Sequence, residues 1–267
     1  MPGKISLANA DGPPLQKSGG TLLCYSKRVI IDGRQIAEDI LAGLGDSLRG
    51  KKLGIVVNIG DSATESFVKI KTKIAERLGV EIQHGRLDDL VALCDGVIVQ
   101  LPHPDAETLL TQLPANKDID ALGPTPLVQA PVAEAVAEVL RREGVGVANK
   151  KAVVVGEGIL VGGPVAQMLR SMGANVSVVT LEKGSLAELK DADIVVSGAG
   201  SPHLIKPEML KQGVVLIDAG ASEQGGKVVG DADPGCAEVA SVFTPVPGGV
   251  GPIAVAMLFK NLAMLVK

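Results

Sequence analysis

Three polar residues in the first half of the sequence have side chains suited to proton transfer or polar binding: Lys71, Gln100 and Asp120. Lys71 lies in a predicted helix, Gln100 ends a predicted strand, and Asp120 follows in a loop. Taken singly, each has a structural interpretation that is at least as favourable: a solvated charge, a polar strand cap or a turn former. Together, however, they belong at one edge of a predicted sheet, where α/β proteins form clefts.

A second functional pattern is the glycine-rich stretch at residues 156–162. An apolar run at 152–155 predicts a buried parallel strand, and Gly156 and Gly158 predict a tight turn after it. Gly162 lies where a following helix would press on that strand. Such a turn brings backbone N–H groups and the positive end of a helix dipole to one point, which suits a phosphate. The spacing alone is equally compatible with an ordinary tight turn.

Alternating strands and helices must position both sets of residues. After the glycine turn, strands are predicted at 176–179, 194–197 and 214–217 with helical stretches between them, which favours a parallel nucleotide-binding sheet. The first half alternates in the same way. Its predicted strands are 22–26 or 28–31, 53–59, 80–83 and 96–101, and its predicted helices are 34–48, 63–78, 88–94, 105–113 and 126–142.

The pattern divides the chain into two α/β lobes. Residues 1–143 are assigned to an N-terminal lobe and residues 144–248 to a Rossmann-type lobe with a parallel sheet. The glycine-containing stretch 143–150 is the predicted linker. A rigid Pro- and Gly-rich turn at 245–252 leads into the last helix, and the segment 249–267 is expected to return to the first lobe and complete it.

The composition is that of a globular protein with an aliphatic core. The 267 residues are 46% hydrophobic but only 1% aromatic, so aliphatic side chains must fill the core. A net charge of −4 and the scarcity of aromatic residues for base stacking argue against a nucleic-acid partner. No apolar run reaches membrane-spanning length, and residues 1–20 are a polar leader without an apolar signal core, so we expect a cytoplasmic protein.

Neither the cysteines nor the histidines predict a metal site. Cys24, Cys94 and Cys236 are odd in number and far apart, which favours reduced thiols over a disulfide framework or a zinc site. The three histidines also lack metal-ligand spacing. We therefore expect no metal.

Seven short segments stand out in order along residues 28–267. They are Gly-Asp-Ser-Ala-Thr-Glu-Ser-Phe-Val-Lys-Ile-Lys at 60–71, Val-Gln-Leu-Pro-His-Pro at 99–104, Lys-Asp-Ile-Asp at 117–120, Val-Gly-Glu-Gly-Ile-Leu-Val-Gly-Gly-Pro at 155–164, Ile-Asp-Ala-Gly at 217–220, Gly-Asp-Ala-Asp at 230–233 and Thr-Pro-Val-Pro-Gly-Gly-Val-Gly-Pro at 244–252. This ordered set resembles the motifs of the methylenetetrahydrofolate dehydrogenase/cyclohydrolase family, and the last segment is the most specific of them.

The resemblance implies a two-lobed enzyme that holds a tetrahydrofolate derivative between its lobes and a nicotinamide cofactor on the second lobe. It implies oxidation of 5,10-methylenetetrahydrofolate by hydride transfer. The same pocket would then add water to the methenyl product and open it to 10-formyltetrahydrofolate. A homodimer that forms contacts through the second lobe is also implied.

The resemblance assigns roles to individual residues. Lys71 would polarise the folate-bound carbon and assist proton movement, which a desolvated cleft favours because it disfavours the ammonium form. Gln100 would position Lys71, and Asp120 would hold the pterin amino groups. The catalytic set is Lys71, Gln100, Asp120 and Phe67, and the substrate-binding set is Thr64, Phe67, Gln100, Pro102, Asp120, Pro247, Gly248 and Gly249. The cofactor-binding set is Gly156, Glu157, Gly158, Val161, Gly162, Thr180, Gly198, Ala199, Gly220, Ala221, Gly249 and Ala254.

Several residues depart from the family pattern. Phe67 stands in place of a tyrosine, and a phenyl ring cannot make the hydrogen bonds of a phenol, so the cyclohydrolase step is the one affected. Glu157 and Gly158 replace an Arg-Ser pair, and Thr180 falls where a histidine would lie. A carboxylate there would repel the 2′-phosphate of NADP and could accept from a free ribose hydroxyl. NAD is therefore expected to be favoured over NADP. Ala254 also replaces a threonine.

Two other interpretations remain open. The chain could be a folate- or nucleotide-binding protein that keeps the fold and has lost its chemistry, which Phe67 and Glu157 support. The joint presence of Lys71, Gln100 and Asp120 opposes that interpretation. An unrelated dinucleotide-dependent dehydrogenase would explain the second lobe but not the motifs of the first.

Overall fold

The computed structural model describes residues 28–58, 62–180 and 182–267, and it describes residues 62–67 by their backbone alone. Several sequence predictions lie outside the described residues. They are the polar leader, the alternative strand at 22–26, Cys24, the end of the strand predicted at 53–59, and the side chains of Thr64 and Phe67.

The first lobe is built on a three-stranded parallel sheet in the order β3-β2-β4. Its strands are β2 (Lys52–Val56), β3 (Glu81–His84) and β4 (Gly96–Val99), and its helices are α2 (Ser62–Leu78), α3 (Leu87–Leu93) and α4 (Ala106–Gln112). Apolar side chains of α3 and α4 cover one face of the sheet. The other face packs against α2 and two helices from elsewhere in the chain, α1 (Gly33–Leu44) and α7 (Val250–Leu265).

The second lobe is a six-stranded parallel sheet in the order β1-β11-β8-β7-β5-β6. Its strands are β1 (Val29–Ile30), β5 (Lys151–Val155), β6 (Asn175–Val179), β7 (Ile194–Ser197), β8 (Val215–Asp218) and β11 (Val242–Phe243). Its further elements are helix α6 (Gly162–Ser171), the short 3-10 helices η1 (Leu186–Asp191), η2 (Pro207–Met209) and η3 (Pro234–Glu238), and a hairpin of β9 (Ser222–Gln224) and β10 (Lys227–Val229). The buried apolar strands occur within one or two residues of their predicted positions, whereas the hairpin and β11 were not predicted.

Strand β1 crosses from the first segment of the chain to the second sheet. Val29 and Ile30 pair in parallel with Val242 and Phe243, so β1 becomes an edge strand beside β11. The strand was predicted at 28–31, but its partner could not be read from the sequence. Directly after it, Asp32 caps the N-terminus of α1. Its Oδ1 accepts hydrogen bonds of 3.1 Å from the backbone N–H groups of Arg34 and Gln35.

Two predicted helices lose four or more residues at one end in the structure. Helix α5 (Pro131–Arg142) starts five residues later than predicted, because Ala130 is extended (φ −57°, ψ 127°), as the residue before a proline usually is. Helix α1 ends before Gly45, whose φ of +53° breaks the helical path. No helix in the described part of the chain is both long and apolar enough to cross a membrane.

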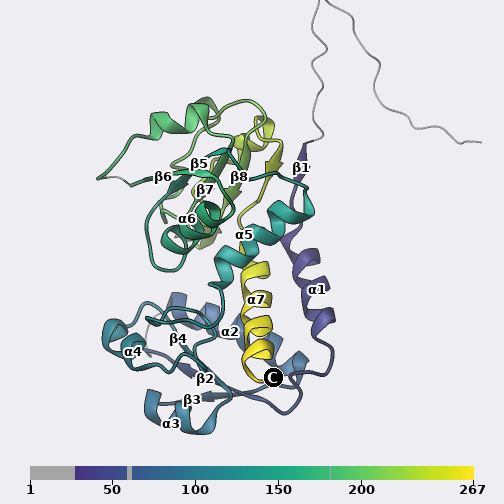
Figure 1. Ribbon diagram of the computed structural model, residues 1–267, viewed down its shortest axis with the longest axis vertical. Coiled ribbons are helices and arrows are strands. Elements are labelled where there is room, and N and C mark those ends of the chain that lie inside the picture. Colours follow the sequence, from purple (N-terminus) through teal and green to yellow (C-terminus); the bar gives the residue numbers. More distant parts are fainter. Residues whose placement is uncertain (1–27, 59–61, 181) are drawn as a thin grey trace, which may run out of the picture.

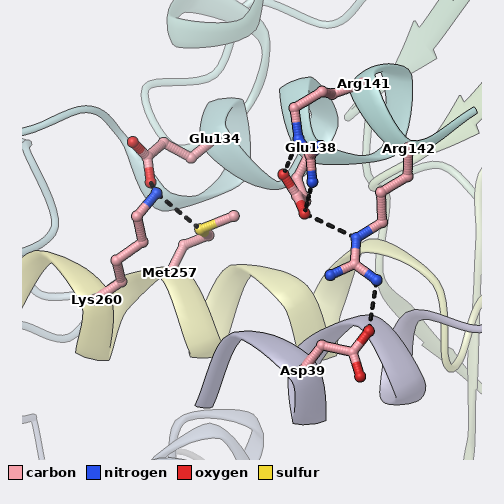
Figure 2. Close-up of polar contacts among 7 residues, drawn as sticks. All are labelled: Asp39, Glu134, Glu138, Arg141, Arg142, Met257 and Lys260. Carbon is pink, nitrogen blue, oxygen red and sulfur yellow. Dashed lines mark hydrogen bonds and ion pairs between the residues drawn. The ribbon is translucent and has the colours of Figure 1, made fainter. Parts of the chain in front are cut away.

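Helices α1, α5 and α7 lie between the two sheets and connect the lobes (Figure 1). Helix α7 packs against both α1 and α5. Figure 2 shows the polar contacts around these helices: Arg142 Nη1 lies 2.6 Å from Asp39 Oδ2 on α1, and its Nε lies 2.7 Å from Glu138 Oε1 on α5. Lys260 Nζ of α7 lies 3.3 Å from Glu134 Oε2 of α5. The last helix returns to the first lobe as predicted. Its apolar side chains pack in the core of the first sheet and also in the core shared with α5 and the second sheet.

Candidate active site

Lys71 and Gln100 form a buried polar pair in the first lobe. Lys71 lies on α2 and Gln100 directly follows β4, and their side chains are 9% and 7% exposed. Lys71 Nζ donates a 2.7 Å hydrogen bond to Gln100 Oε1. Gln100 Nε2 donates in turn to the carbonyl oxygen of Leu101 at 2.8 Å, which leaves the amide oxygen directed at the lysine. The lysine is therefore held by a neutral acceptor in a desolvated place.

The carboxylate of Asp120 completes this polar group. Burial lowers the pKa of Lys71 below its ordinary value, and the negative charge of Asp120 opposes that shift. Burial also raises the pKa of Asp120, while Lys71 opposes the rise and Asp118 adds to it. The two groups therefore sense one another across a space of low dielectric. The structure brings Lys71 and Gln100 into contact, and Asp120 acts on Lys71 through its charge.

Asp118 is the turn former of the Lys-Asp-Ile-Asp loop. It is fully buried and accepts from the backbone N–H of Asp120 at 3.2 Å and of Gly123 at 2.7 Å. Lys117 ties the same loop to the first sheet, because its carbonyl oxygen accepts from the N–H of Val97 at 2.7 Å. Asp118 thus shapes the loop that carries Asp120.

Asn261 is a residue that sequence reasoning missed. It is the buried amide in the apolar helix α7, and its Nδ2 donates to the carbonyl oxygens of Ile119 at 3.0 Å and Gln129 at 2.8 Å. These bonds fasten the Asp120 loop and the segment before α5 to the last helix. An asparagine on the buried face of a helix whose other polar side chain is Lys260 was the available signal.

The glycine-rich turn follows β5 as predicted. Gly156 has a φ of +98°, and a Cβ on it would lie 2.7 Å from the carbonyl oxygen of Gly198. A Cβ on Gly162 would overlap the backbone of Gly156, and one on Gly198 would overlap the side chain of Val161. Gly158 differs, because a Cβ there would meet no atom within 4 Å. The turn is closely packed beneath and open above Gly158.

Glu157 lies at the rim of this turn. Its side chain is exposed, and its Oε1 lies 3.5 Å from Nζ of Lys183, a residue that sequence reasoning missed. Lys183 belongs to the turn after β6, in which Thr180 Oγ1 accepts from the backbone N–H groups of Glu182 and Lys183. Because β5 and β6 are neighbours in the sheet, the two turns lie beside each other at its edge.

The Pro-Val-Pro-Gly-Gly turn docks against the start of α1. Gly33 N donates to the carbonyl oxygen of Gly248 at 2.9 Å, and a Cβ on Gly33 would overlap the carbonyl oxygen of Gly249. Gly248 has a φ of +107°, which favours glycine. Gly249 caps α7, and Ala254 on that helix packs against the core shared by α5, α6 and the second sheet.

The remaining predicted residues lie at loops that follow strands. Ala199 donates its N–H to Asp231, and Gly220 lies against the same carboxylate. Pro102, Ala221 and Pro247 are exposed at such loops. Asp218 and Asp231, which stand inside two of the quoted motifs, were not recognised as site residues from the sequence.

The second lobe fits a dinucleotide. Its parallel sheet reverses strand order beside β5, where β6 lies on one side and β7 on the other. Ligands of such sheets bind in the crevice at that point, with the pyrophosphate at the glycine turn and the start of the following helix. The space open above Gly158 lies there. Fold and site together define a two-lobed α/β protein with a dinucleotide-binding lobe and a buried lysine in the other.

Comparison with known proteins names the family. The family model described as "Tetrahydrofolate dehydrogenase/cyclohydrolase, NAD(P)-binding domain" matches residues 130–267. The chain is 36% identical to the "Bifunctional protein FolD" of Halothermothrix orenii over 270 residues, which cover 87% of this chain and 95% of the relative. The chain therefore belongs to the tetrahydrofolate dehydrogenase/cyclohydrolase family and carries its NAD(P)-binding domain.

Solved structures agree with the fold. The bifunctional FolD methylenetetrahydrofolate dehydrogenase/cyclohydrolase of Campylobacter jejuni has a TM-score of 0.82 at 28% identity, covering 89% of this chain and 98% of its own. The Trypanosoma brucei FolD enzyme, solved with NADP cofactor and an inhibitor, has a TM-score of 0.81 at 30% identity, covering 90% and 97%. The predicted family, the two-lobed α/β fold and the NAD(P)-binding lobe are thereby confirmed.

Proposed function

We propose that this protein oxidises 5,10-methylenetetrahydrofolate to the 5,10-methenyl compound with a nicotinamide cofactor and then hydrolyses the product to 10-formyltetrahydrofolate. Family membership supports the reaction. The observation that supports this site is the buried hydrogen bond of 2.7 Å between Lys71 and Gln100, electrostatically coupled to Asp120. When bound, the nicotinamide accepts the hydride that leaves the one-carbon group.

Lys71 is the proton-handling residue in this proposal. Its lowered pKa makes the neutral amine more available at neutral pH than in a solvated lysine. Gln100 accepts a hydrogen bond from the amine of Lys71. The other N–H groups or the lone pair of that amine are then directed toward the substrate. A group of intermediate basicity at a fixed position can both donate and accept a proton, which hydrolysis of the methenyl product requires.

Asp120 is the proposed anchor for the pterin ring. A carboxylate accepts strong hydrogen bonds from N–H donors, and the amino groups of a pterin offer a planar edge of such donors. The loop that carries Asp120 is held by Asp118 and Asn261, so its position does not depend on the ligand. Burial raises the pKa of Asp120, and the charge of Lys71 favours its ionised form.

The proposed division of the site follows the two lobes. Residues 1–143, together with 249–267, form the folate-binding domain, and residues 144–248 form the cofactor domain, with β1 attached to the cofactor sheet. The assigned substrate residues beyond the central three are Thr64, Phe67, Pro102, Pro247, Gly248 and Gly249. The assigned cofactor residues are Gly156, Glu157, Gly158, Val161, Gly162, Thr180, Gly198, Ala199, Gly220, Ala221, Gly249 and Ala254.

Lys71→Met tests the assignment. Dehydrogenation is followed by the absorbance of the methenyl product, and the variant should lose turnover by a factor of roughly 10² or more. Lys73→Met, on the exposed side of the same helix, is the matched control and should keep wild-type rates. Undiminished turnover in Lys71→Met would refute its role. A wild-type protein that binds folate without turnover would instead support the interpretation as a binding protein.

The proposed cofactor preference is NAD over NADP. Glu157 places a carboxylate at the ribose end of the glycine turn, and its ion pair offsets the positive charge of Lys183. Dissociation constants for both cofactors test this preference, and tighter binding of NADP would contradict it. Glu157→Gln should improve NADP binding about fivefold by removing a repulsive charge, and Lys183→Met should weaken it.

We also propose a homodimer in the cytoplasm. The family resemblance supports a dimer through exposed elements of the second lobe, and light scattering of the purified protein would measure its mass. The free thiols of Cys94 and Cys236 are compatible with a reducing compartment. Cell fractionation with a tagged full-length chain would test the location.

A further inference from the structure

Two buried carboxylates lie beneath the edge of the cofactor sheet. Asp218 ends β8 and is 1% exposed, and Asp231 follows the β9–β10 hairpin and is 0% exposed. No ion pair of either is found among the described residues of the chain. Buried carboxylates without a cationic partner are unfavourable unless hydrogen bonds compensate them. Their hydrogen bonds therefore identify what these two groups hold in place.

Asp231 organises the end of β7 and the loop after it. Its Oδ2 accepts from the hydroxyl of Ser197 at 2.6 Å and from the N–H of Ala199 at 2.7 Å. Its Oδ1 accepts from the N–H of Ser201 at 2.7 Å. Gly220 closes over the same carboxylate, where a Cβ would overlap it. One side chain thus fixes two backbone N–H groups in a loop that is otherwise free of regular structure.

Asp218 fastens Asp231 in turn. Its Oδ1 accepts from Gly220 N at 2.9 Å and its Oδ2 accepts from Ala232 N at 2.8 Å. Its own N–H donates to Thr244 Oγ1 at 2.7 Å. The two carboxylates therefore connect the loops after β7 and β8 with the segment that carries Asp231.

The loop held by Asp231 forms one wall of the cofactor crevice. The crevice expected for such a sheet lies beside β5, and the loop after β7 packs against the glycine turn there: a Cβ on Gly156 would lie 2.7 Å from Gly198 O, and one on Gly198 would overlap the side chain of Val161. The opposite wall, with Glu157, lies toward β6. A shift of the β7 loop would therefore change the width of the site.

We propose that Asp231 is a positioning residue for the cofactor, which holds residues 198–201 in the conformation that receives the nicotinamide half of the dinucleotide. This proposal rests on the proposed function only in its assignment of that lobe to NAD(P). Asp231 does not touch the reacting atoms. It acts through the N–H groups of Ala199 and Ser201, whose positions it sets before any ligand arrives.

Asp231→Asn is the direct test. An asparagine has one acceptor oxygen, and its NH₂ group would face an N–H or hydroxyl donor. The hydrogen bonds to one of the two carboxylate oxygens are therefore lost. Titration of the full-length protein with reduced cofactor, followed by cofactor fluorescence, should show about tenfold or more weaker binding. The KM for folate should stay within about twofold of the wild-type value. Wild-type cofactor affinity in the variant would overturn the proposal.

Val195→Ala separates positioning from general destabilisation. Val195 is fully buried in the middle of β7, so its truncation weakens the same strand without touching the loop. It should lower the melting temperature and leave cofactor affinity unchanged. A loss of affinity equal to that of Asp231→Asn would overturn the proposal.

Ser197→Ala is the substitute if Asp231→Asn does not fold. It removes one of the three donors to Asp231 and should weaken cofactor binding about threefold. Unchanged affinity in this variant would also overturn the proposal. A wild-type protein that binds the cofactor but does not oxidise the folate would refute the proposed function alone, because the binding comparison between variants stands without turnover.

Discussion

Lys71 donates its buried hydrogen bond of 2.7 Å to an uncharged oxygen, that of Gln100. A carboxylate at this position would favour the ammonium form of the lysine and raise its pKa. An amide orients the amine without adding a full negative charge. The pair therefore reconciles two requirements of proton transfer, a fixed position and a lowered pKa.

Gln100→Glu should keep Lys71 in position but remove its lowered pKa. The new carboxylate raises the pKa of Lys71, so kcat/KM for dehydrogenation should increase only at higher pH and fall roughly tenfold or more at pH 7. A pH–rate profile measures the displacement of its acidic limb. Gln112→Glu on the exposed end of α4 is the control, and a profile equally displaced there would show that overall charge is the cause.

Phe67→Tyr should strengthen the hydrolytic step. This prediction rests on residue type alone, because a phenol can hydrogen-bond to water or to a lysine and a phenyl ring cannot. We expect the ratio of cyclohydrolase to dehydrogenase rates to rise about tenfold, since general acid–base assistance contributes factors of that order or more. Both rates are read from the formation and decay of methenyl absorbance. An unchanged ratio would show that the lack of a tyrosine at position 67 does not limit the hydrolytic step.

Asp218 should make stability fall as the pH rises. Burial raises its pKa from 3.8 to about 6, so the folded state binds this proton more tightly than the unfolded state. The resulting contribution is complete below pH 4, declines between pH 4 and 6, and amounts to about 3 kcal/mol lost at neutral pH.

Asp218→Asn tests this pH dependence because the amide cannot ionise. Urea unfolding at pH 4.5 and pH 7.5 should show the wild type losing about 2 kcal/mol of stability relative to the variant, because about 1 kcal/mol of the total is already lost at pH 4.5. Asp193→Asn is the control for the sign of the effect. Hydrogen bonding to Lys211 lowers the pKa of Asp193, so the stability that this carboxylate contributes should change with pH in the opposite direction. A constant difference between wild type and Asp218→Asn at both pH values would contradict the prediction.

Arg142 should contribute more to the joining of the lobes than its neighbour Arg141. Arg142 bonds Asp39 on α1 as well as Glu138 on its own helix (Figure 2). Hydrogen bonds from Arg141 first and from Arg142 second lower the pKa of Glu138 to about 2, so the bond to Asp39 is what distinguishes Arg142. Arg141 bonds only Glu138 among the residues drawn there, and its side chain is 69% exposed. Arg142→Met should lower the melting temperature by roughly 2–4 °C and Arg141→Met by about 1 °C or less. Equal losses would mean that the link to α1 adds nothing.

The sequence by itself determined the local elements and the family. Buried parallel strands such as 194–197 are continuous apolar runs, and a glycine turn such as 156–162 needs its residue types for reasons of backbone geometry and close packing. The motifs around Lys71, Gln100 and Asp120 have a specific order along the chain, which is enough to identify a family without any contact being known. The start of α5 was one local error, because the effect of Pro131 on Ala130 was overlooked, and the end of α1 at Gly45 was another.

Only the tertiary structure decided which distant segments meet. Nothing in two residues such as Val29 and Ile30 indicates a partner more than two hundred positions away, because any edge strand offers the same backbone groups. Asp231 looks like a turn residue until Ser197, Ala199 and Ser201 are seen to converge on it. Asn261 likewise acquires a role only when α7 lies against the Asp120 loop. Burial and hydrogen bonding between remote residues are properties of the packed chain, so local residue patterns cannot contain them.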